Sequence, residues 1–173
     1  MYELCKREGR GLNCRFLAQV LSEMYLAMGF PSRFVTCQSK AYDTDTDCHV
    51  INMVWSRQLG KWIWMDASFA AYVTDENGLL LHPGEVRERL IKGLPLVLNE
   101  DANWNHKTKQ TKEGYLENYM AKNLYMLDAH LESRFETEPA DGSGSPRMYL
   151  VPEGFWPLSG HTTYDDRYFW QAP

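Results

Sequence analysis

The sequence predicts an α+β fold in which a buried amphipathic helix packs on an antiparallel sheet. Three observations support this prediction. Residues 14–28 repeat apolar side chains at helical spacing, residues 48–55 alternate as a strand does, and residues 61–66 follow a glycine-containing turn as a second strand. No internal repeat is visible along the chain.

The helix expected at residues 14–28 carries apolar side chains at positions 17, 20, 21, 24 and 28, which predicts one buried stripe. Asn13 is a good candidate for its N-cap, because Asn side chains accept hydrogen bonds from the first helical turn. Gly29 and Pro31 follow the helix in the usual order for a C-terminal end. Cys14 is therefore expected in the first turn.

Two strands are expected to bring a histidine and an aspartate together. After a short strand at residues 32–37, residues 48–55 alternate, with His49 on one face and Cys48 on the other. A turn at residues 58–60 leads into an antiparallel partner that ends at Asp66. Because the start of the first strand of a hairpin lies beside the end of the second, His49 and Asp66 become neighbours.

The remaining segments complete a single expected domain. Asn77-Gly78 marks a turn, residues 83–91 and 114–131 look helical, residues 92–113 and 139–146 are expected to be loops, and residues 147–151 a last strand. The C-terminal aromatic residues are too many for a free tail, so they should pack on the body or on a partner: Phe155, Trp156, Tyr164, Tyr168, Phe169 and Trp170. We expect one domain at 1–173, with a motif-bearing core at 9–91 and a C-terminal helical and aromatic extension at 92–173.

Composition narrows the class of protein. The chain has 173 residues, is 44% hydrophobic and carries a net charge of −5, which suits one globular domain with a substantial core. Its basic residues are scattered, so we do not expect nucleic-acid binding. No apolar run reaches the roughly 18 residues of a membrane span, and the N-terminus lacks the pattern of a signal peptide. The compartment and the oligomeric state stay open.

Cys14, His49 and Asp66 together fit the three roles of a cysteine-nucleophile triad. The unpaired N–H groups and the dipole of a helix start favour a thiolate and can stabilise an oxyanion. A histidine beside the thiolate later protonates the leaving group, and a carboxylate fixes the tautomer of that histidine. The sequence therefore predicts Cys14 as nucleophile, His49 as base and acid, and Asp66 as the orienting group.

Four short motifs around these residues resemble the transglutaminase-like superfamily, within the wider papain-like cysteine enzymes. They are Gly11–Cys14, Ala27–Arg33, Asp47–Val50 and Trp64–Ser68, and the resemblance covers about residues 9–70. It implies a papain-like core and the same three roles for Cys14, His49 and Asp66. In the family, Pro-Thr commonly follows the aspartate, whereas Ala67-Ser68 follows it here and keeps the hydroxyl.

The resemblance leaves the oxyanion hole and the reaction open. Family members usually supply a further oxyanion donor from upstream of the cysteine, whereas thirteen residues precede Cys14 here, so only its own N–H is expected to serve. We expect thiol-dependent acyl chemistry on a peptide or protein substrate through a thioester, with hydrolysis favoured over transglutaminase cross-linking. The alternative is a catalytically inactive binding or scaffolding domain, and a redox-sensing thiol is a weaker third hypothesis.

The other reactive side chains receive structural interpretations. Cys48 is expected in the core and Cys5 and Cys37 to be inert, although spacing alone leaves disulfides open. The histidines His82, His106 and His130 are expected at the surface or as helix caps rather than as metal ligands. His161, near two aspartates, is the weak exception. No metal or cofactor is expected. The tryptophans Trp55, Trp62 and Trp64 should pack the hairpin, and residues 43–47 should form a solvated acidic turn.

Overall fold

The computed structural model describes residues 2–9, 11–139, 141–155 and 161–173, with the backbone alone at residues 2, 4 and 5. The helices are α1 (Tyr2–Glu8), α2 (Cys14–Ala27), α3 (Pro83–Lys92), the π-helix η1 (Glu113–Met120), α4 (Ala121–Asn123) and α5 (Asp166–Phe169). The strands are β1 (Ser32–Gln38), β2 (Cys48–Ser56), β3 (Lys61–Met65), β4 (Val73–Thr74), β5 (Val97–Leu98), β6 (Asn103–Trp104), β7 (Thr108–Lys109), β8 (Met126–His130), β9 (Arg147–Leu150) and β10 (His161–Thr163).

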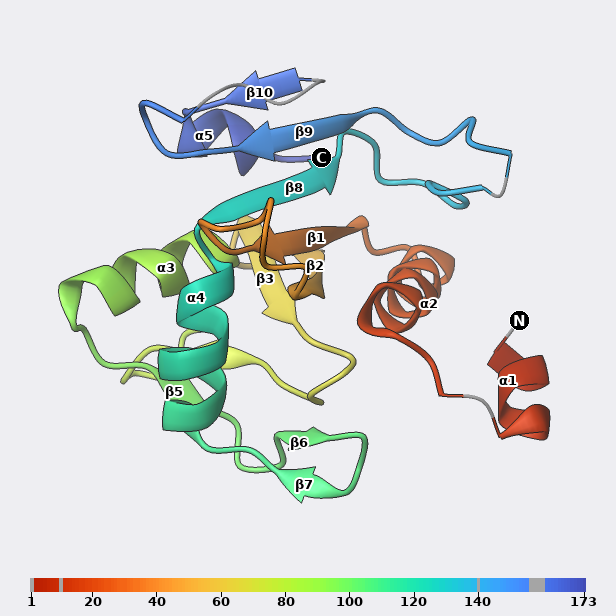
Figure 1. Cartoon of the computed structure of the whole chain (residues 1–173), viewed down its shortest axis with the longest axis horizontal. Coiled ribbons are helices and arrows are strands. Elements are labelled where there is room, and N and C mark those ends of the chain that lie inside the picture. The colour runs from red at the N-terminus through yellow and green to blue at the C-terminus, as the bar shows by residue number, and fades with distance from the viewer. Residues whose placement is uncertain (1, 10, 140, 156–160) are drawn as a thin grey trace.

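Six of these strands form the main sheet, in the order β10-β9-β8-β1-β2-β3. Neighbouring strands run antiparallel, except that β10 is parallel to β9. Helix α2 lies on one side of the sheet, and α3 and α4 lie on the other (Figure 1). This arrangement confirms an α+β fold with a largely antiparallel sheet.

The register of the β2–β3 hairpin fixes the positions of the predicted site residues. Strands β1, β2 and β3 lie where the alternation predicts them, and Asn52 of β2 pairs with Met65 at the end of β3. Asp66, one residue further, therefore lies opposite residue 51 and diagonal to His49. Side chains at such positions share one face of the sheet.

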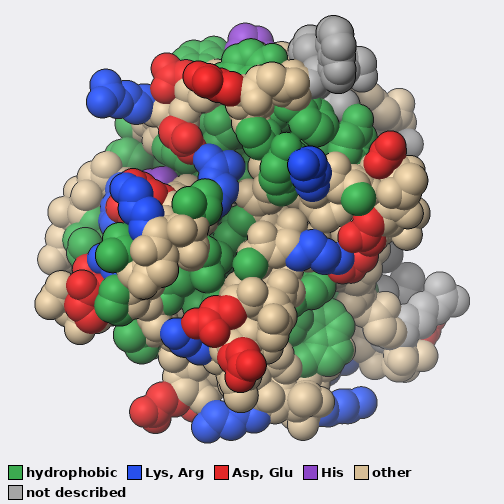
Figure 2. Space-filling model, turned by 60° about the vertical axis from the view of Figure 1, so that its left-hand side comes forward, with side chains coloured by type: hydrophobic (Ala, Val, Ile, Leu, Met, Phe, Trp, Pro, Cys, Tyr) green, Lys and Arg blue, Asp and Glu red, His purple; other side chains and the backbone are tan. Residues whose placement is uncertain are grey.

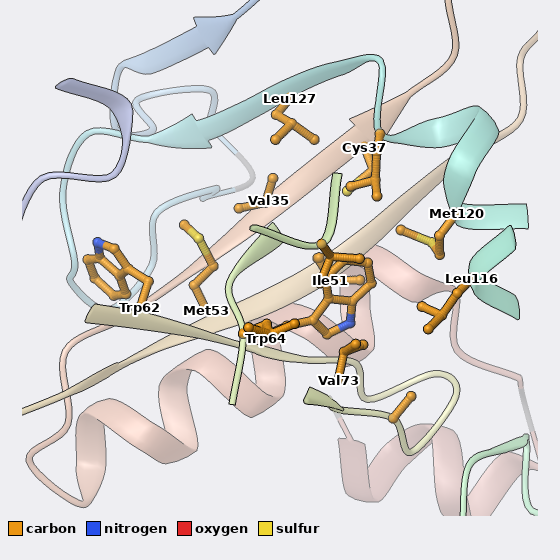
Figure 3. Close-up of a cluster of buried hydrophobic side chains, with 14 of the residues drawn as sticks. Val35, Cys37, Ile51, Met53, Trp62, Trp64, Val73, Leu116, Met120 and Leu127 are labelled. Atoms are coloured by element: carbon orange, nitrogen blue, oxygen red, sulfur yellow. The ribbon is translucent and has the colours of Figure 1, made fainter. Parts of the chain in front are cut away.

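The main core lies on the side of the sheet that faces η1 (Figure 3), and Val86 of α3 belongs to the same cluster. Strands β2 and β3 contribute Ile51, Met53, Trp62 and Trp64, and the π-helix contributes Leu116 and Met120. Trp55 lies edge-on to Trp62 at 5.4 Å between ring centroids. The tryptophans thus pack the hairpin, as predicted.

Helix α2 meets the other face of the sheet through small residues, which corrects the predicted apolar stripe. Ala18 and Ser22 are its buried residues, whereas Met24 is 58% exposed. The close approach allows Asn52 of β2 to donate a 2.6 Å hydrogen bond to the carbonyl oxygen of Ala18. Larger side chains would hold the helix further from the sheet, so α2 packs through the face that carries Ala18 and Ser22.

The segment expected to be one helix at 114–131 changes structure twice. Residues 113–120 form η1, in which the N–H of Ala121 bonds to the carbonyl oxygen of Leu116, and after α4 the chain continues as strand β8. The helical prediction is therefore wrong from residue 126, because all five residues of β8 are buried, so the strand shows no alternation and its apolar positions also fit helical spacing. The loop expected at 92–113 contains the short strands β5, β6 and β7.

Residues beyond 92 contribute strands rather than only helices and aromatic side chains. Strand β8 pairs with β1, and β9 pairs with β8, at residues 126–130 and 147–150. Phe169 of α5 is fully buried in the main core, so this part of the aromatic C-terminal segment packs on the body, as predicted. Trp156 lies outside the described residues. None of the helices in the described part of the chain has both the length and the apolar character needed to cross a bilayer.

Candidate active site

His49 and Asp66 form a buried pair at one end of the β2–β3 hairpin. The Nε2 atom of His49 lies 2.6 Å from Oδ2 of Asp66, and neither side chain is more than 1% exposed. The hairpin brings them together as the strand register predicts. Because Nε2 is engaged by the carboxylate, Nδ1 is the ring nitrogen left for a second partner.

The turn that follows β3 holds the Asp66 side chain in place. Asp66 and Ala71 exchange two backbone hydrogen bonds, of 2.8 and 3.0 Å, which close the turn. Inside it, Oδ1 of Asp66 accepts the N–H groups of Ser68 at 2.8 Å and Phe69 at 3.2 Å. Ala70 adopts a φ of +47°, a conformation that is uncommon for residues other than glycine. The Ser68 hydroxyl is buried and has no hydrogen-bond partner among the described residues, so the contact with Asp66 is made by its backbone.

Tyr115 of η1 also contacts Asp66. Its hydroxyl donates a 2.5 Å hydrogen bond to Oδ2, the same oxygen that faces His49. Tyr115 is fully buried. Burial, the charge of Asp66 and this hydrogen bond raise the pKa of Tyr115 well above its usual value, so the phenol keeps its proton and remains a donor.

Cys14 opens helix α2, as predicted, and Asn13 caps that helix. The Oδ1 atom of Asn13 accepts the N–H of Phe16 at 2.9 Å. Cys14 is partly exposed and packs beside Val50 of β2. Burial raises the pKa of the thiol, but the hydrogen bond and charge of His49 and the N–H groups of Val50 and Arg15 outweigh it, so the pKa lies below its ordinary value.

The electrostatics of His49 favour an imidazolium at neutral pH. Burial lowers the pKa of His49, but the charge and hydrogen bond of Asp66, together with Cys14, raise it to about 9. Two aromatic rings shield the imidazole edge-on, with centroids of Phe69 at 5.2 Å and Tyr119 at 5.5 Å. A lowered thiol pKa beside a raised imidazole pKa is the signature of a thiolate–imidazolium pair.

Aromatic side chains continue from the pair towards the surface. Trp104 of β6 packs on Phe69 with ring centroids 4.6 Å apart, and it is 40% exposed. Because His49 and Asp66 are buried while Cys14 is partly exposed, a substrate would reach the sulfur rather than the carboxylate.

The structure corrects the interpretations of two residues and supports others. Cys48 is exposed rather than in the core, and His130 is buried at 2% exposure, with Nδ1 3.2 Å from the carbonyl oxygen of Ser145. His82 caps α3, as predicted, by accepting the N–H of Gly84 at 3.1 Å. Cys14, Cys37 and Cys48 are free thiols, and the side chain of Cys5 lies outside the described residues.

The acidic turn and His161 show no sign of a metal centre. In the acidic turn, Asp45 and Asp47 form ion pairs with Lys122 at 3.0 and 2.7 Å. His161 is exposed, with its ring 5.7 Å from that of Tyr168. Within the described ranges, no three His, Cys, Asp or Glu side chains come together as metal ligands would.

A cavity of about 880 Å³ lies away from the Cys14–His49–Asp66 group. Its apolar lining includes Leu90, Ile91, Leu124 and Val151, and charged side chains such as Arg87 stand among them. Figure 2 views the face that carries α3 and α4, where hydrophobic side chains reach the surface between charged ones. Neither a cysteine nor a histidine is among the residues that line this cavity.

Sequence reasoning missed the residues that surround the pair. Tyr115 is not among the apolar positions 116, 119 and 120 from which the helix at 114–131 is predicted, and its contact with Asp66 spans 49 positions of chain, so no local pattern indicates it. Trp104 lies in a segment without periodicity. Phe69 could have been found, because it follows Asp66 within one tight turn.

The comparisons with known proteins agree with the motifs. Residues 2–67 match the model of the transglutaminase-like superfamily, which confirms the resemblance predicted from the sequence. The matched segment contains Cys14, His49 and Asp66 and ends before Tyr115. No curated protein and no solved structure shows a significant match to the chain.

Proposed function

We propose that this chain, with its transglutaminase-like segment at residues 2–67, is a cysteine-dependent enzyme that transfers an acyl group from a peptide or amide. Cys14 is the nucleophile, His49 the general acid and base, and Asp66 the residue that orients His49. The proposed reaction requires only these side chains, backbone N–H groups and an acyl acceptor. The surrounding core would be papain-like in its arrangement.

One observation supports this proposal above the others. Cys14 starts a capped helix and interacts with the side chain of a histidine whose Nε2 lies 2.6 Å from a buried carboxylate. A histidine that only fills a core does not need a buried anion and a nucleophile on its two nitrogens. Removal of either partner would leave a buried charge uncompensated, which is costly.

The proposed reaction proceeds in two half-reactions. The Cys14 thiolate attacks the carbonyl carbon, and the N–H of Cys14, which has no acceptor inside the helix, donates to the developing oxyanion. The imidazolium of His49 gives its Nδ1 proton to the leaving amine, and the tetrahedral species collapses to a thioester. Neutral His49 then removes a proton from the acceptor, which attacks the thioester and releases Cys14.

Water is the acceptor that we favour. Hydrolysis gives a peptidase or amidase, whereas a lysine amine would give a cross-linked product from the same thioester. The partly exposed Cys14 is open to water, and nothing in the sequence marks a dedicated amine site.

A thioester-trapping experiment tests the function. The wild type is mixed with a p-nitrophenyl acyl ester, and the product of a single turnover is digested and analysed by mass spectrometry. We expect a burst of p-nitrophenol and an acyl group on Cys14, both lost in Cys14→Ser, and slowed by about 100-fold or more in His49→Ala. Added primary amine then separates the acceptors, because an amide product reports transamidation and free acid reports hydrolysis. Acylation spread over several cysteines would reject the proposal.

A second candidate is a binding domain without catalysis, and the cavity of about 880 Å³ favours it. Ligand pockets are commonly apolar and of this size. In that case Cys14 would not be acylated. A ligand would bind against Leu90 and Ile91 in the cavity and would leave the labelling rate of Cys14 unchanged. The acyl-transfer proposal predicts the opposite pattern.

A further inference from the structure

We propose that Tyr115 is a positioning residue that holds Asp66 and thereby sets the basicity of His49. This inference rests on the proposed function, because it assigns Tyr115 to the same site. It concerns a residue outside the segment that matches the family model, which ends at residue 67. The observation is the 2.5 Å hydrogen bond from the Tyr115 hydroxyl to Oδ2 of Asp66.

Both oxygens of the Asp66 carboxylate have defined partners. Oδ1 accepts the N–H groups of Ser68 and Phe69, and Oδ2 meets both Nε2 of His49 and the hydroxyl of Tyr115. The backbone contacts fix one end of the carboxylate, and Tyr115 fixes the end that faces the histidine. Without Tyr115, the position of Oδ2 would depend on the His49 contact alone.

The local structure around Tyr115 is unusual. Tyr115 lies in the π-helix η1, which also presents Tyr119 to the imidazole ring of His49. Segments of π-helix are rare and occur frequently at functional sites. A phenylalanine at position 115 would fill the same apolar space against Phe69, whose ring centroid is 4.6 Å away. The hydroxyl therefore serves the contact with Asp66 rather than the packing.

Several titratable groups surround His49, and their charges decide whether the loss of the Tyr115 hydroxyl raises or lowers the pKa of His49. They are Cys14 from α2, Cys37 from β1, Asp66 after β3, and Tyr115 and Tyr119 from η1. Among these, Asp66 makes the larger contribution to raising the pKa of His49, and Cys14 makes the smaller one. The Tyr115 hydrogen bond draws part of that charge away from Nε2. Its removal should therefore hold the imidazolium more tightly and raise the pKa of His49.

The test is site-resolved alkylation of the full chain with iodoacetamide from pH 5 to pH 11, on wild type, Tyr115→Phe and Tyr125→Phe. Tyr125 is a matched control, because its ring contacts Phe155 and lies outside the site. Cys37 is fully buried and reports folding, since it labels only if the protein opens. The labelling rate of Cys14 should rise first as the thiolate forms, and again as His49 loses its proton.

In Tyr115→Phe we expect the second rise to move to higher pH, the first rise to stay in place and acyl transfer to slow about tenfold, with Cys37 unlabelled. Tyr125→Phe should behave as wild type. An unchanged second rise with normal acyl transfer would overturn the role of Tyr115 and leave the proposed function intact. A wild type whose Cys14 shows no early rise would overturn both. If Tyr115→Phe opens and labels Cys37, an NMR titration of His49 in the folded form of Tyr115→Phe decides instead. A raised pKa of His49 supports the role of Tyr115, and an unchanged pKa rejects it.

Discussion

Cys14 illustrates how neighbours, rather than residue type, determine reactivity at the scale of single residues. Burial opposes ionisation of its thiol, and Cys48, which is more exposed, has a raised pKa because burial and the charge of Cys14 dominate there. Cys14 differs in having His49 and two backbone N–H groups as partners. The thiol pKa is therefore lowered at Cys14 and raised at Cys48, so the reactivity of one cysteine can be compared with that of the other in the same protein.

His82 offers a residue-scale prediction about pH and stability. It caps α3, and burial lowers its pKa, with the charge of Glu85 acting in the opposite direction. The neutral imidazole accepts hydrogen bonds, so its contribution is complete above the unfolded-state pKa of about 6.5 and is lost as pH falls through the lower folded value. We expect His82→Ala to lower the free energy of unfolding by about 0.5–2 kcal/mol at pH 8 and by less at pH 5.

Urea denaturation at both pH values measures this effect. The control is His82→Asn, which keeps a capping acceptor that does not titrate and should retain most of the stability at both pH values. An equal loss for His82→Ala at pH 8 and pH 5 would contradict the capping role of the neutral ring.

The prediction of the site from sequence succeeded where local geometry is regular. Hairpin pairing follows from alternation and turn residues, so it places His49 beside Asp66, and the N-cap preference places Cys14 at a helix start. Tyr115 reaches Asp66 through a contact across 49 positions of chain, and a contact so distant in sequence leaves no periodic signal.

At the scale of elements, helix α2 must approach the sheet closely for Cys14 to reach Val50 and His49. The approach depends on Ala18, which is 1% exposed, and on the hydrogen bond from Asn52 to its carbonyl oxygen. Hydrophobic periodicity alone predicted a larger apolar stripe, because it does not register how small a contact face must be. The exposed side of α2 retains Met24 and Met28.

Ala18→Leu tests this packing. The larger side chain has no space against β2, so we expect a loss of about 1–3 kcal/mol in the free energy of unfolding. It should also slow the alkylation of Cys14, since the helix start would move away from Val50. Met24→Leu, on the exposed side, should change stability by less than about 0.5 kcal/mol. Normal Cys14 labelling in Ala18→Leu would show that the close approach is not required.

At the scale of the whole molecule, the segments before and after residue 92 share one core. Leu127 of β8 and Phe169 of α5 pack in the same cluster as Ile51 and Trp64 of the hairpin. The strand predicted at 147–151 is confirmed as β9, whereas β8 was missed, because the buried residues 126–130 show no alternation to separate a strand from a helix. The expected boundary at residue 92 therefore separates the part of the sequence that carries the motifs from the part that does not. We propose that the chain folds as one unit.

Calorimetry of wild type and Leu127→Ala tests this unity. Leu127 is fully buried, so its truncation should lower the free energy of unfolding by about 2–5 kcal/mol. We expect one transition in each protein, with the calorimetric and van't Hoff enthalpies equal. Independent domains would instead give two transitions, and Leu127→Ala would shift only the transition of the segment after residue 92.

The most direct test of the central claim compares the alkylation rates of Cys14 and Cys48 at pH 6.5 in wild type and His49→Ala. Both thiols are accessible, and buried Cys37 reports any unfolding. The account predicts that Cys14 of the wild type reacts at least about tenfold faster than Cys48, and that His49→Ala removes most of this difference while Cys37 stays unlabelled. Equal rates in the wild type, or a fast Cys14 that does not depend on His49, would contradict it.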